Sequence, residues 1–574
     1  MRAVGLLVVI ACAGCTAGAP GPGVDSARVL AHVGALTAAG PRPGDSEQAR
    51  QAARYIEATL AGAGVTAERM PVGVVDVPGI TVLGSAYRRA HRVETTDPDL
   101  VVRFGPPPPS GKALLVMAHY DTVPTSPGAV DNAAAVGVLL ELARALAASP
   151  PPIPVILVFT ANEERGLVGA EALAARIGDG VGLALALDLI GGSGALSLNG
   201  AGELVGASEM RWLARAADRA GVIVRAPLAH RVVSRWWPQA ERSDHGAFTR
   251  RGIRAFHLYD RGQDGEWIDL AYHREGDVLE RVDRASVDEL GRLLRALVAE
   301  PLPAPGSDGF WMPVLANTVI ARWMLIALEL VLAVLALALL FAQRGPLARG
   351  GLGLLAGSGC YGVAVIATVA LERGVAGAHV APWLHAPRSF AIALALVLAG
   401  TFGLLAGLVR RMRPWVGEQR YLALACALLL AIGGTLVAIG AAELAWIWLV
   451  PAAITAIAPR LGRARILGVL ATLLPVVLVL APEQLREAAW NGFLPLGVPL
   501  TAWLALFGLP VAGGVAWYLR SLGTVGPLGA LVLSLGCALA ILAGAVSVTH
   551  AHPRCDAAKF NQFHLACERT PGVR

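Results

Sequence analysis

Eight apolar stretches with few charges, all in the second half of the chain, constrain its fold more than any other feature. Most are close to the roughly 20 residues that a helix needs to cross a bilayer, although the fifth and sixth are shorter. They span 323–342, 351–371, 389–409, 421–440, 444–458, 466–481, 494–519 and 526–548. The mean hydropathy of the 574 residues is +0.58, which excludes a single soluble domain. The pattern predicts an all-α membrane domain of about eight helices at 322–549.

The distribution of charge predicts which side of the membrane each part occupies. Residues 1–300 carry 30 basic and 33 acidic side chains, whereas residues 301–574 carry 18 and 9. The excess arginines lie in short connections between apolar stretches, which argues against a nucleic-acid-binding patch. Ten of them follow the first, third, fifth and seventh stretches, and three lie in the opposite connections. Because short cytoplasmic connections are rich in arginine, we expect residues 1–300 and the tail 550–574 to lie outside the cytoplasm.

The start of the chain has the character of an export signal. Arg2 precedes the apolar run Ala3–Ala13, and small residues follow. The pattern fits a cleaved signal peptide, a retained anchor or, through Cys15, a lipid anchor, and the sequence leaves the three open. We expect residues 1–22 to direct the next part of the chain out of the cytoplasm, most simply across a bacterial inner membrane. Outside the cytoplasm, Cys555 and Cys567 of the tail are able to form a disulfide.

Residues 23–300 alternate between short apolar runs and longer helical patterns. This alternation is typical of an α/β domain with a mostly parallel central sheet flanked by helices. The expected strands are Ala113–Ala118, Ile153–Thr160, Leu183–Leu187, Val222–Val224 and Ile253–Leu258. The expected helices are Ala133–Ala148, Leu167–Ile177, Glu209–Ala220 and Ser286–Ala299. Three prolines within 301–305 end the last helix and begin a linker to the membrane domain, 301–321.

Acidic and histidine residues follow the predicted strands. His119 and Asp121 come at the end of the first strand, Glu163 and Glu164 after the second, and Asp188 after the third. Asp131 stands just before a helix, and Tyr272 and His273 follow the last strand. Ligands of α/β sheets bind outside the carboxyl ends of the strands, and histidine with carboxylates suits borderline divalent metals. No cysteine lies between residues 23 and 300, which excludes a thiolate zinc site in this domain.

The same residues resemble a known family, the co-catalytic zinc aminopeptidases that include leucyl aminopeptidases, glutamate carboxypeptidases and glutaminyl cyclases. The resemblance covers roughly residues 30–300. It rests on motifs in the family's order: AHYDTV, GAVDNAAAVGVLLELA, VFTANEERGLVGAEAL, LALDLIG, SDHGAF and AYHREGD. A peptidase domain followed by many membrane spans is similar to the endoplasmic-reticulum metallopeptidase and the vacuolar membrane protease.

The resemblance implies a site with two zinc ions. His119 and Asp188 would bind one ion, Glu164 and His273 the other, and Asp131 would bridge them. Glu163 would be the general base. Asp121 would orient the imidazole of His119, and Tyr272 would donate a hydrogen bond to the tetrahedral intermediate. Asp244 and His245, in the SDHGAF motif, have no assigned role, and a structural one is favoured for them.

The sequence therefore favours a membrane-bound, outward-facing zinc metallopeptidase that removes N-terminal residues from peptides. The expected partners are peptide substrates and the lipid bilayer, without nucleic acid; the oligomeric state is open. Within the family, a glutaminyl cyclase with one zinc is an alternative. A receptor or transporter with a degenerate peptidase domain is a third interpretation. The intact Glu163 argues against it, and Glu329 in the first span is better explained by a structural helix bundle.

Overall fold

A computed structural model describes most of residues 23–305, with gaps at 83–84, 89, 108–111, 193–195, 200–203, 226–242 and 261–270. Beyond these it describes 310–311, 319–320, 322–341, 418–438, 441–461 and short pieces between 467 and 567. The predicted leader 1–22 lies outside the described residues. So do the apolar stretches 351–371, 389–409, 494–519 and 526–548, and most of 466–481.

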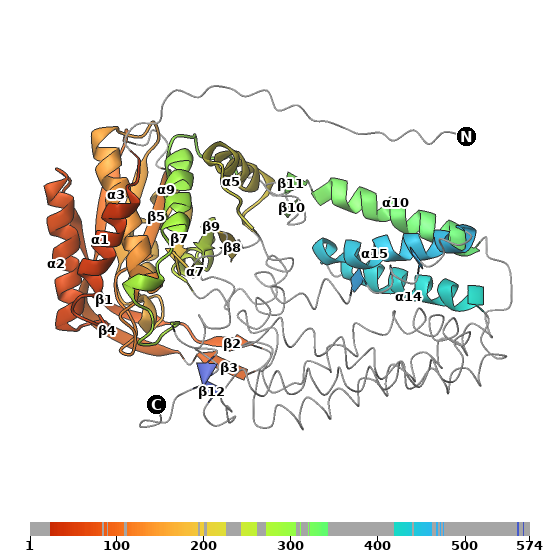
Figure 1. Ribbon diagram of the computed structural model, residues 1–574, viewed down its shortest axis with the longest axis horizontal. Coiled ribbons are helices and arrows are strands. Elements are labelled where there is room, and N and C mark those ends of the chain that lie inside the picture. Colours follow the sequence, from red (N-terminus) through yellow and green to blue (C-terminus); the bar gives the residue numbers. More distant parts are fainter. Residues whose placement is uncertain are drawn as a thin grey trace.

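A seven-stranded mixed sheet forms the centre of the first domain (Figure 1). Its order is β1-β4-β6-β5-β7-β9-β8. The strands are β1 Glu68–Val77, β4 His91–Phe104, β5 Ala113–His119, β6 Val155–Thr160, β7 Val181–Asp188, β8 Ser197–Asn199 and β9 Ala255–Tyr259. The four central strands β6, β5, β7 and β9 pair in parallel. At one edge β4 pairs antiparallel with β6 and β1 with β4, and at the other edge β8 pairs antiparallel with β9. The predicted parallel sheet is therefore confirmed at the centre, with antiparallel additions at both edges. A separate short hairpin pairs β2 Ile80–Val82 with β3 Ser85–Arg88.

The strand predicted at Val222–Val224 is wrong. This stretch follows the helix α5 Ala207–Ala220 and forms one isolated bridge, between Ser197 and Arg225. Val222 and Val224 are buried, which explains the apolar pattern. The edge of the sheet next to β9 is occupied by β8, and the bridge places Arg225 beside β8.

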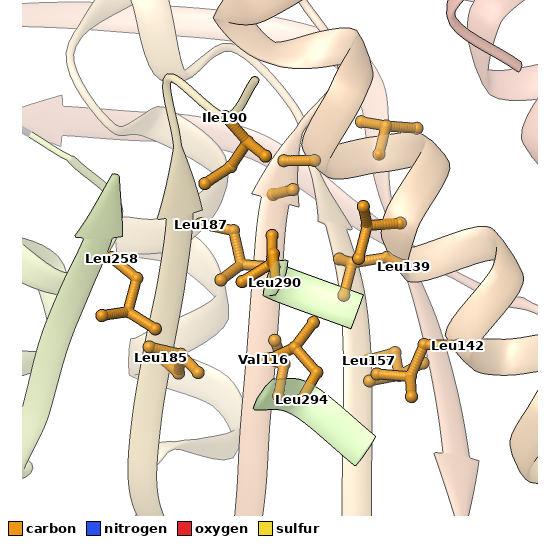
Figure 2. Packing of buried hydrophobic residues seen from close by; sticks show 14 of the residues in the cluster. Val116, Leu139, Leu142, Leu157, Leu185, Leu187, Ile190, Leu258, Leu290 and Leu294 are labelled. Atoms are coloured by element: carbon orange, nitrogen blue, oxygen red, sulfur yellow. The ribbon is translucent and has the colours of Figure 1, made fainter. Parts of the chain in front are cut away.

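Helices cover both faces of the sheet because the strands are apolar on both sides. Alternate residues of β5 enter different clusters: Leu114 and Val116 pack on one face, and Leu115 and Met117 on the other. The first face carries α1 Ser26–Thr37, α2 Glu47–Gly62, α3 Ala134–Ala148, α5 and α9 Arg284–Val298. The second face carries α4 Val168–Ile177 and α7 His245–Thr249. Figure 2 shows Leu290 and Leu294 over Val116, beside Leu139 and Leu142.

The connection after α9 lies along the domain. Leu302 packs against the main core, and a Cβ added at Gly182 would lie 2.9 Å from Leu302 Cδ1 and 3.2 Å from Lys112 Cβ. Arg254 Nη1 donates to Pro303 O at 3.1 Å, and Ser208 Oγ to Ala304 O at 2.6 Å. The predicted linker is thus fastened, along 302–304, near the amino ends of β5 and β7. It continues through the short strands β10 Phe310–Trp311 and β11 Val319–Ile320, which contact α5.

Three helices are described in the apolar half: α10 Arg322–Phe341, α14 Glu418–Ala438 and α15 Ala442–Ile457. They coincide with the first, fourth and fifth predicted stretches and pack together around Cys426, Leu429 and Trp448 (Figure 1). In the tail, β12 Phe560–Asn561 pairs with β13 Ala566–Cys567. Among the described residues, no helix meets the length and hydropathy required of a membrane span.

Candidate metal centre

The metal-ligand candidates meet at the carboxyl ends of neighbouring strands. His119 is the last residue of β5 and Asp188 the last of β7, while Glu163 and Glu164 begin a 3-10 turn, η2 Glu163–Arg165, directly after β6. Because β6, β5 and β7 are adjacent and parallel, their ends share one edge of the sheet. Strand order alone therefore brings His119, Asp188 and the Glu163–Glu164 pair to one edge of the sheet.

Two further ligands come from loops. Asp131 lies in η1 Ala129–Ala133, a short turn that leads into α3, and its peptide bond to Asn132 is cis. His273 has a left-handed backbone conformation with φ of 57°, and Asn162, before the Glu163–Glu164 pair, has φ of 56°. Non-glycine residues in this region are uncommon and cluster at functional sites.

The first ligand group consists of His119, Asp131 and Asp188. His119 Nε2 lies 3.3 Å from Asp131 Oδ1 and 3.4 Å from Asp188 Oδ1. The three candidate ligand atoms lie within 4.8 Å of one another and all three residues are buried. They offer one nitrogen and two carboxylate oxygens to a single point.

The second group consists of Asp131, Glu164 and His273. His273 Nε2 lies 3.2 Å from Asp131 Oδ2 and 3.3 Å from Glu164 Oε1. The two groups therefore share Asp131, whose two oxygens face different histidines. A carboxylate shared in this way can bridge two cations.

The donor set fits zinc. Imidazole nitrogen and carboxylate oxygen are usual zinc ligands, and three protein ligands per ion leave a position open for water or substrate, as in catalytic sites. In the metal-free protein, burial lowers the pKa of His273, but Glu164 and Asp131 outweigh it and raise this pKa to about 10. Burial acts on the pKa of His119 in the same way, and Glu163, Asp131 and Asp188 raise it well above its usual value. Both histidines thus lie in strongly negative surroundings that favour a bound cation.

A comparison with known families agrees with this geometry. The sequence profile of peptidase family M28 matches residues 99–298. The match covers 200 of the 574 residues. The resemblance deduced from the motifs is confirmed, and the matched stretch contains all the predicted site residues.

Several curated proteins are similar to parts of this chain. Aminopeptidase YwaD of Bacillus subtilis is 29% identical over 197 residues, which are 33% of this chain and 40% of that protein. A vacuolar membrane protease of Candida glabrata is 45% identical over 60 residues, 10% of this chain and 6% of its own length. Endoplasmic reticulum metallopeptidase 1 of Rattus norvegicus is 41% identical over 64 residues, 11% of this chain and 7% of its own. The chain thus spans 40% or less of these relatives.

Among solved structures, the aminopeptidase from Aneurinibacillus sp. strain AM-1 aligns with 49% of this chain and 98% of its own. The sequence identity is 15% and the TM-score 0.38.

Asp121 contacts His119 through its backbone carbonyl, whereas the prediction did not specify which group of Asp121 orients the imidazole. Its backbone oxygen lies 3.1 Å from His119 Nδ1, whereas its carboxylate oxygen lies 3.8 Å from that atom. The carboxylate instead accepts the backbone amides of Glu163, at 3.0 Å, and Glu164, at 3.2 Å. The chain turns after β5, which places the Asp121 carbonyl at His119 Nδ1. Asp121 therefore orients His119 through its backbone and the Glu163–Glu164 pair through its side chain.

Glu163 and Tyr272 lie beside the ligands, and the roles of general base and hydrogen-bond donor stay predictions. Glu163 is buried, and burial together with Glu164 and Asp188 raises its pKa well above the usual value. Tyr272 is also buried, and its ring stacks on His273 with centroids 3.9 Å apart. A glutamate with a raised pKa is suited to take up a proton.

Asp277 is a site residue that the sequence argument missed. It is fully buried, and its carboxylate accepts the backbone amides of Val130 at 2.7 Å and Asp131 at 3.1 Å. It therefore fixes the segment that carries the shared ligand. Its place at the end of the AYHREGD motif, four residues after His273, was the available signal.

The SDHGAF residues lie beneath this edge of the sheet. Thr160 Oγ1 donates to Asp244 Oδ2 at 2.5 Å, which ties α7 to the end of β6. His245 stacks on His257 of β9, with ring centroids 5.4 Å apart.

Proposed function

We propose that this protein is a membrane-bound metallopeptidase that binds two zinc ions and removes N-terminal residues from peptides. The observation that carries the proposal is the pair of ligand groups that share Asp131 next to the buried Glu163. The family match supports a peptidase, and the name of one relative, aminopeptidase YwaD, supports an aminopeptidase.

Each residue has a defined part in the proposed hydrolysis. Bound zinc supplies a Lewis acid that polarises the scissile carbonyl and makes water acidic enough to deprotonate near neutral pH. Glu163, buried beside the ligands, takes up the proton of the attacking water and returns it to the departing amine. Tyr272 is placed beside His273 to donate a hydrogen bond to the oxygen that gains charge. Asp121 keeps Glu163 oriented through the backbone amide.

The alternatives are less well supported. A cyclase with one zinc would use one ligand group, whereas this chain offers two. A receptor with a degenerate domain would have no need of a buried glutamate beside complete ligand groups. Both observations favour the peptidase.

The proposal places residues 322–549 in the bilayer, with the peptidase domain and the tail 550–574 outside the cytoplasm. Eight apolar stretches, the arginine distribution and the large exposed apolar side chains of α10 support it. The name of one relative, the vacuolar membrane protease, also refers to a membrane. In alkaline extraction, the chain should remain with the membrane pellet; release into the supernatant would overturn this placement.

The peptidase activity is tested on the full chain in detergent, with zinc restored. Release of amino acids is measured from peptides with free and with blocked N-termini. We expect activity on free N-termini only. Glu163→Gln should lower kcat by about 10²–10⁴-fold while zinc content stays unchanged.

Glu68→Gln is the matched control, because the Glu68 side chain is 58% exposed and pairs with Arg103 on the surface. Its kcat should equal that of the wild type. A zinc-loaded wild type that releases no amino acid from any peptide would contradict the proposal.

A further inference from the structure

A buried arginine contacts the loop that joins His119 to Asp131. Arg42, between α1 and α2, is 1% exposed. Its guanidinium donates to four backbone carbonyls: Tyr120 O at 3.0 Å, Leu36 O at 3.2 Å, Pro127 O at 2.5 Å and Gly128 O at 3.2 Å. Five-donor guanidinium groups suit such multiple contacts, which lysine cannot reproduce.

These acceptors flank the ligands. Tyr120 directly follows His119, and Gly128 directly precedes the turn that carries Asp131. The backbone of Arg42 adds two contacts to the same loop, since Arg42 N donates to Thr122 Oγ1 at 2.7 Å and Thr122 N to Arg42 O at 3.1 Å. The loop from His119 to Asp131 is thus fastened at both ends and in the middle to one residue.

The charge of Arg42 also suits its position. Burial lowers its pKa to about 10, while the nearby carboxylates of Asp277, Asp121 and Asp131 act to raise it. Arg42 is therefore charged at neutral pH and stabilises the ionised carboxylates around the shared ligand.

Three residues further along, Asp45 braces the other side of the centre. Its carboxylate accepts a hydrogen bond from Thr95 Oγ1 at 2.6 Å and pairs with Arg165 Nη1. Arg165 Nη1 in turn donates to Asn162 Oδ1 at 3.1 Å, and Asn162 Nδ2 donates to Thr95 Oγ1 at 3.0 Å. Asn162 immediately precedes the Glu163–Glu164 pair.

Gly44 allows this close approach. A Cβ at Gly44 would lie 1.7 Å from Asn162 Oδ1 and 2.7 Å from Asn162 Cγ. Asn162 is fully buried, so a methyl group there would push it, and the start of η2 with it, out of place.

We infer that residues 41–46 form a clamp, in which Arg42 positions the His119–Asp131 loop and Gly44 and Asp45 position the Glu163–Glu164 turn. This inference rests on the proposed function. The clamp precedes the residues that match family M28, so the matched stretch does not contain all the residues that hold its ligands in place.

The test is a cobalt titration of the metal-free full chain in detergent, followed by visible absorption. Arg42→Lys loses the forked contacts, and Gly44→Ala displaces Asn162. Each should weaken cobalt binding by about 10–100-fold and change the absorption band, as expected when groups that support ligands are removed. Matched controls are Arg54→Lys, whose side chain is 55% exposed and pairs with Glu47, and Gly62→Ala, which meets no atom within 4 Å. Both controls should bind cobalt as the wild type does.

The outcomes separate the clamp from plain stabilisation. If Arg42→Lys and Gly44→Ala only lower the melting temperature while affinity and spectrum stay unchanged, the clamp is overturned. If Arg42→Lys does not fold, Gly44→Ala and Asp45→Asn decide by the same measurement. A folded wild type that binds cobalt and cleaves peptides, with unaffected variants, overturns the clamp alone. A folded wild type that binds no metal overturns the proposed function and the clamp together.

Discussion

Asp131 connects the two ligand groups at the scale of a single residue. One of its oxygens faces His119 and the other faces His273, and its backbone amide is held by Asp277. Asp277, which is not itself a ligand candidate, therefore helps to fix the position of Asp131. A small shift of Asp131 would change both ligand groups at once. A measurement of metal affinity therefore reports on the residues that hold Asp131 in place.

Asp277→Ala tests this dependence. The change leaves the amides of Val130 and Asp131 without their buried acceptor, so we expect zinc affinity to fall by about 10–100-fold. The measurement is competition with a chelator of known affinity. Asp288→Ala on α9 serves as the comparison, because Asp288 is only half-buried and far along the chain from the ligands. Equal affinity in the two variants would contradict the argument.

A second residue-scale prediction concerns pH. In the metal-free protein the pKa of His273 is raised to about 10, above its unfolded value near 6.5. The protonated histidine therefore stabilises the metal-free fold fully below about pH 6.5, and this contribution is lost as pH rises towards 10. Zinc requires the neutral imidazole, so binding at pH 8 should release protons, and affinity should increase with pH across this window.

Calorimetry in two buffers of different ionisation enthalpy counts the released protons. His273→Ala should release fewer than the wild type. The absence of any buffer dependence in the wild type would refute the prediction.

At the scale of elements, strand order explains most of the site. The adjacent ends of β6, β5 and β7 bring three ligands to one edge, and α9 supports this arrangement from the first face of the sheet. Leu290 and Leu294 of α9 face Val116 of β5, and Leu187 and Ile190 lie nearby on and after β7 (Figure 2). The helix therefore contributes stability and no side chain to the metal groups.

Leu290→Ala should lower the free energy of unfolding by about 2–5 kcal/mol, because it leaves a cavity at a fully buried position. KM and kcat should remain at wild-type values at temperatures where the variant is folded. Denaturant unfolding combined with a peptidase assay measures both. A large change in kcat without a loss of stability would show that α9 acts on the site directly.

The sequence predicted the elements that are apolar or periodic throughout. β5, β6, β7 and β9 and the helices α3, α4, α5 and α9 lie within a few residues of their expected bounds. The antiparallel pair of β1 and β4 was not foreseen, since β1 is half-exposed and prolines lie within β1 at 71, just after it at 78 and within β4 at 98. The metal ligands carried a recognisable spacing. Arg42 carried none and Asp277 only its place in the AYHREGD motif, because both act on backbone carbonyls or amides that only the folded chain brings near.

At the scale of the whole molecule, zinc should act as part of the fold. Only the folded chain brings His119, Asp131 and His273 together, so zinc binds the folded state selectively. Free zinc at a thousandfold excess over its Kd would add about 4 kcal/mol to the free energy of unfolding.

Melting curves with and without a chelator test this effect. Removal of zinc should lower the Tm by several degrees, and its return should restore it. Asp131→Asn should show a much smaller difference between the two conditions. A wild-type Tm that does not respond to the chelator would contradict a structural contribution of the metal.

The linker contacts have a consequence for how a peptide reaches the enzyme. Leu302 is held beside Gly182 and Lys112, at the amino ends of the strands, whereas the ligands lie at the carboxyl ends. At about 3.3 Å per residue, the length of β7 separates these two places by roughly 25 Å. The linker contact and the metal ligands thus lie at opposite ends of the sheet. Under the proposed function, we therefore expect a long or bulky peptide to bring its free end to the metal ligands without passing the attachment.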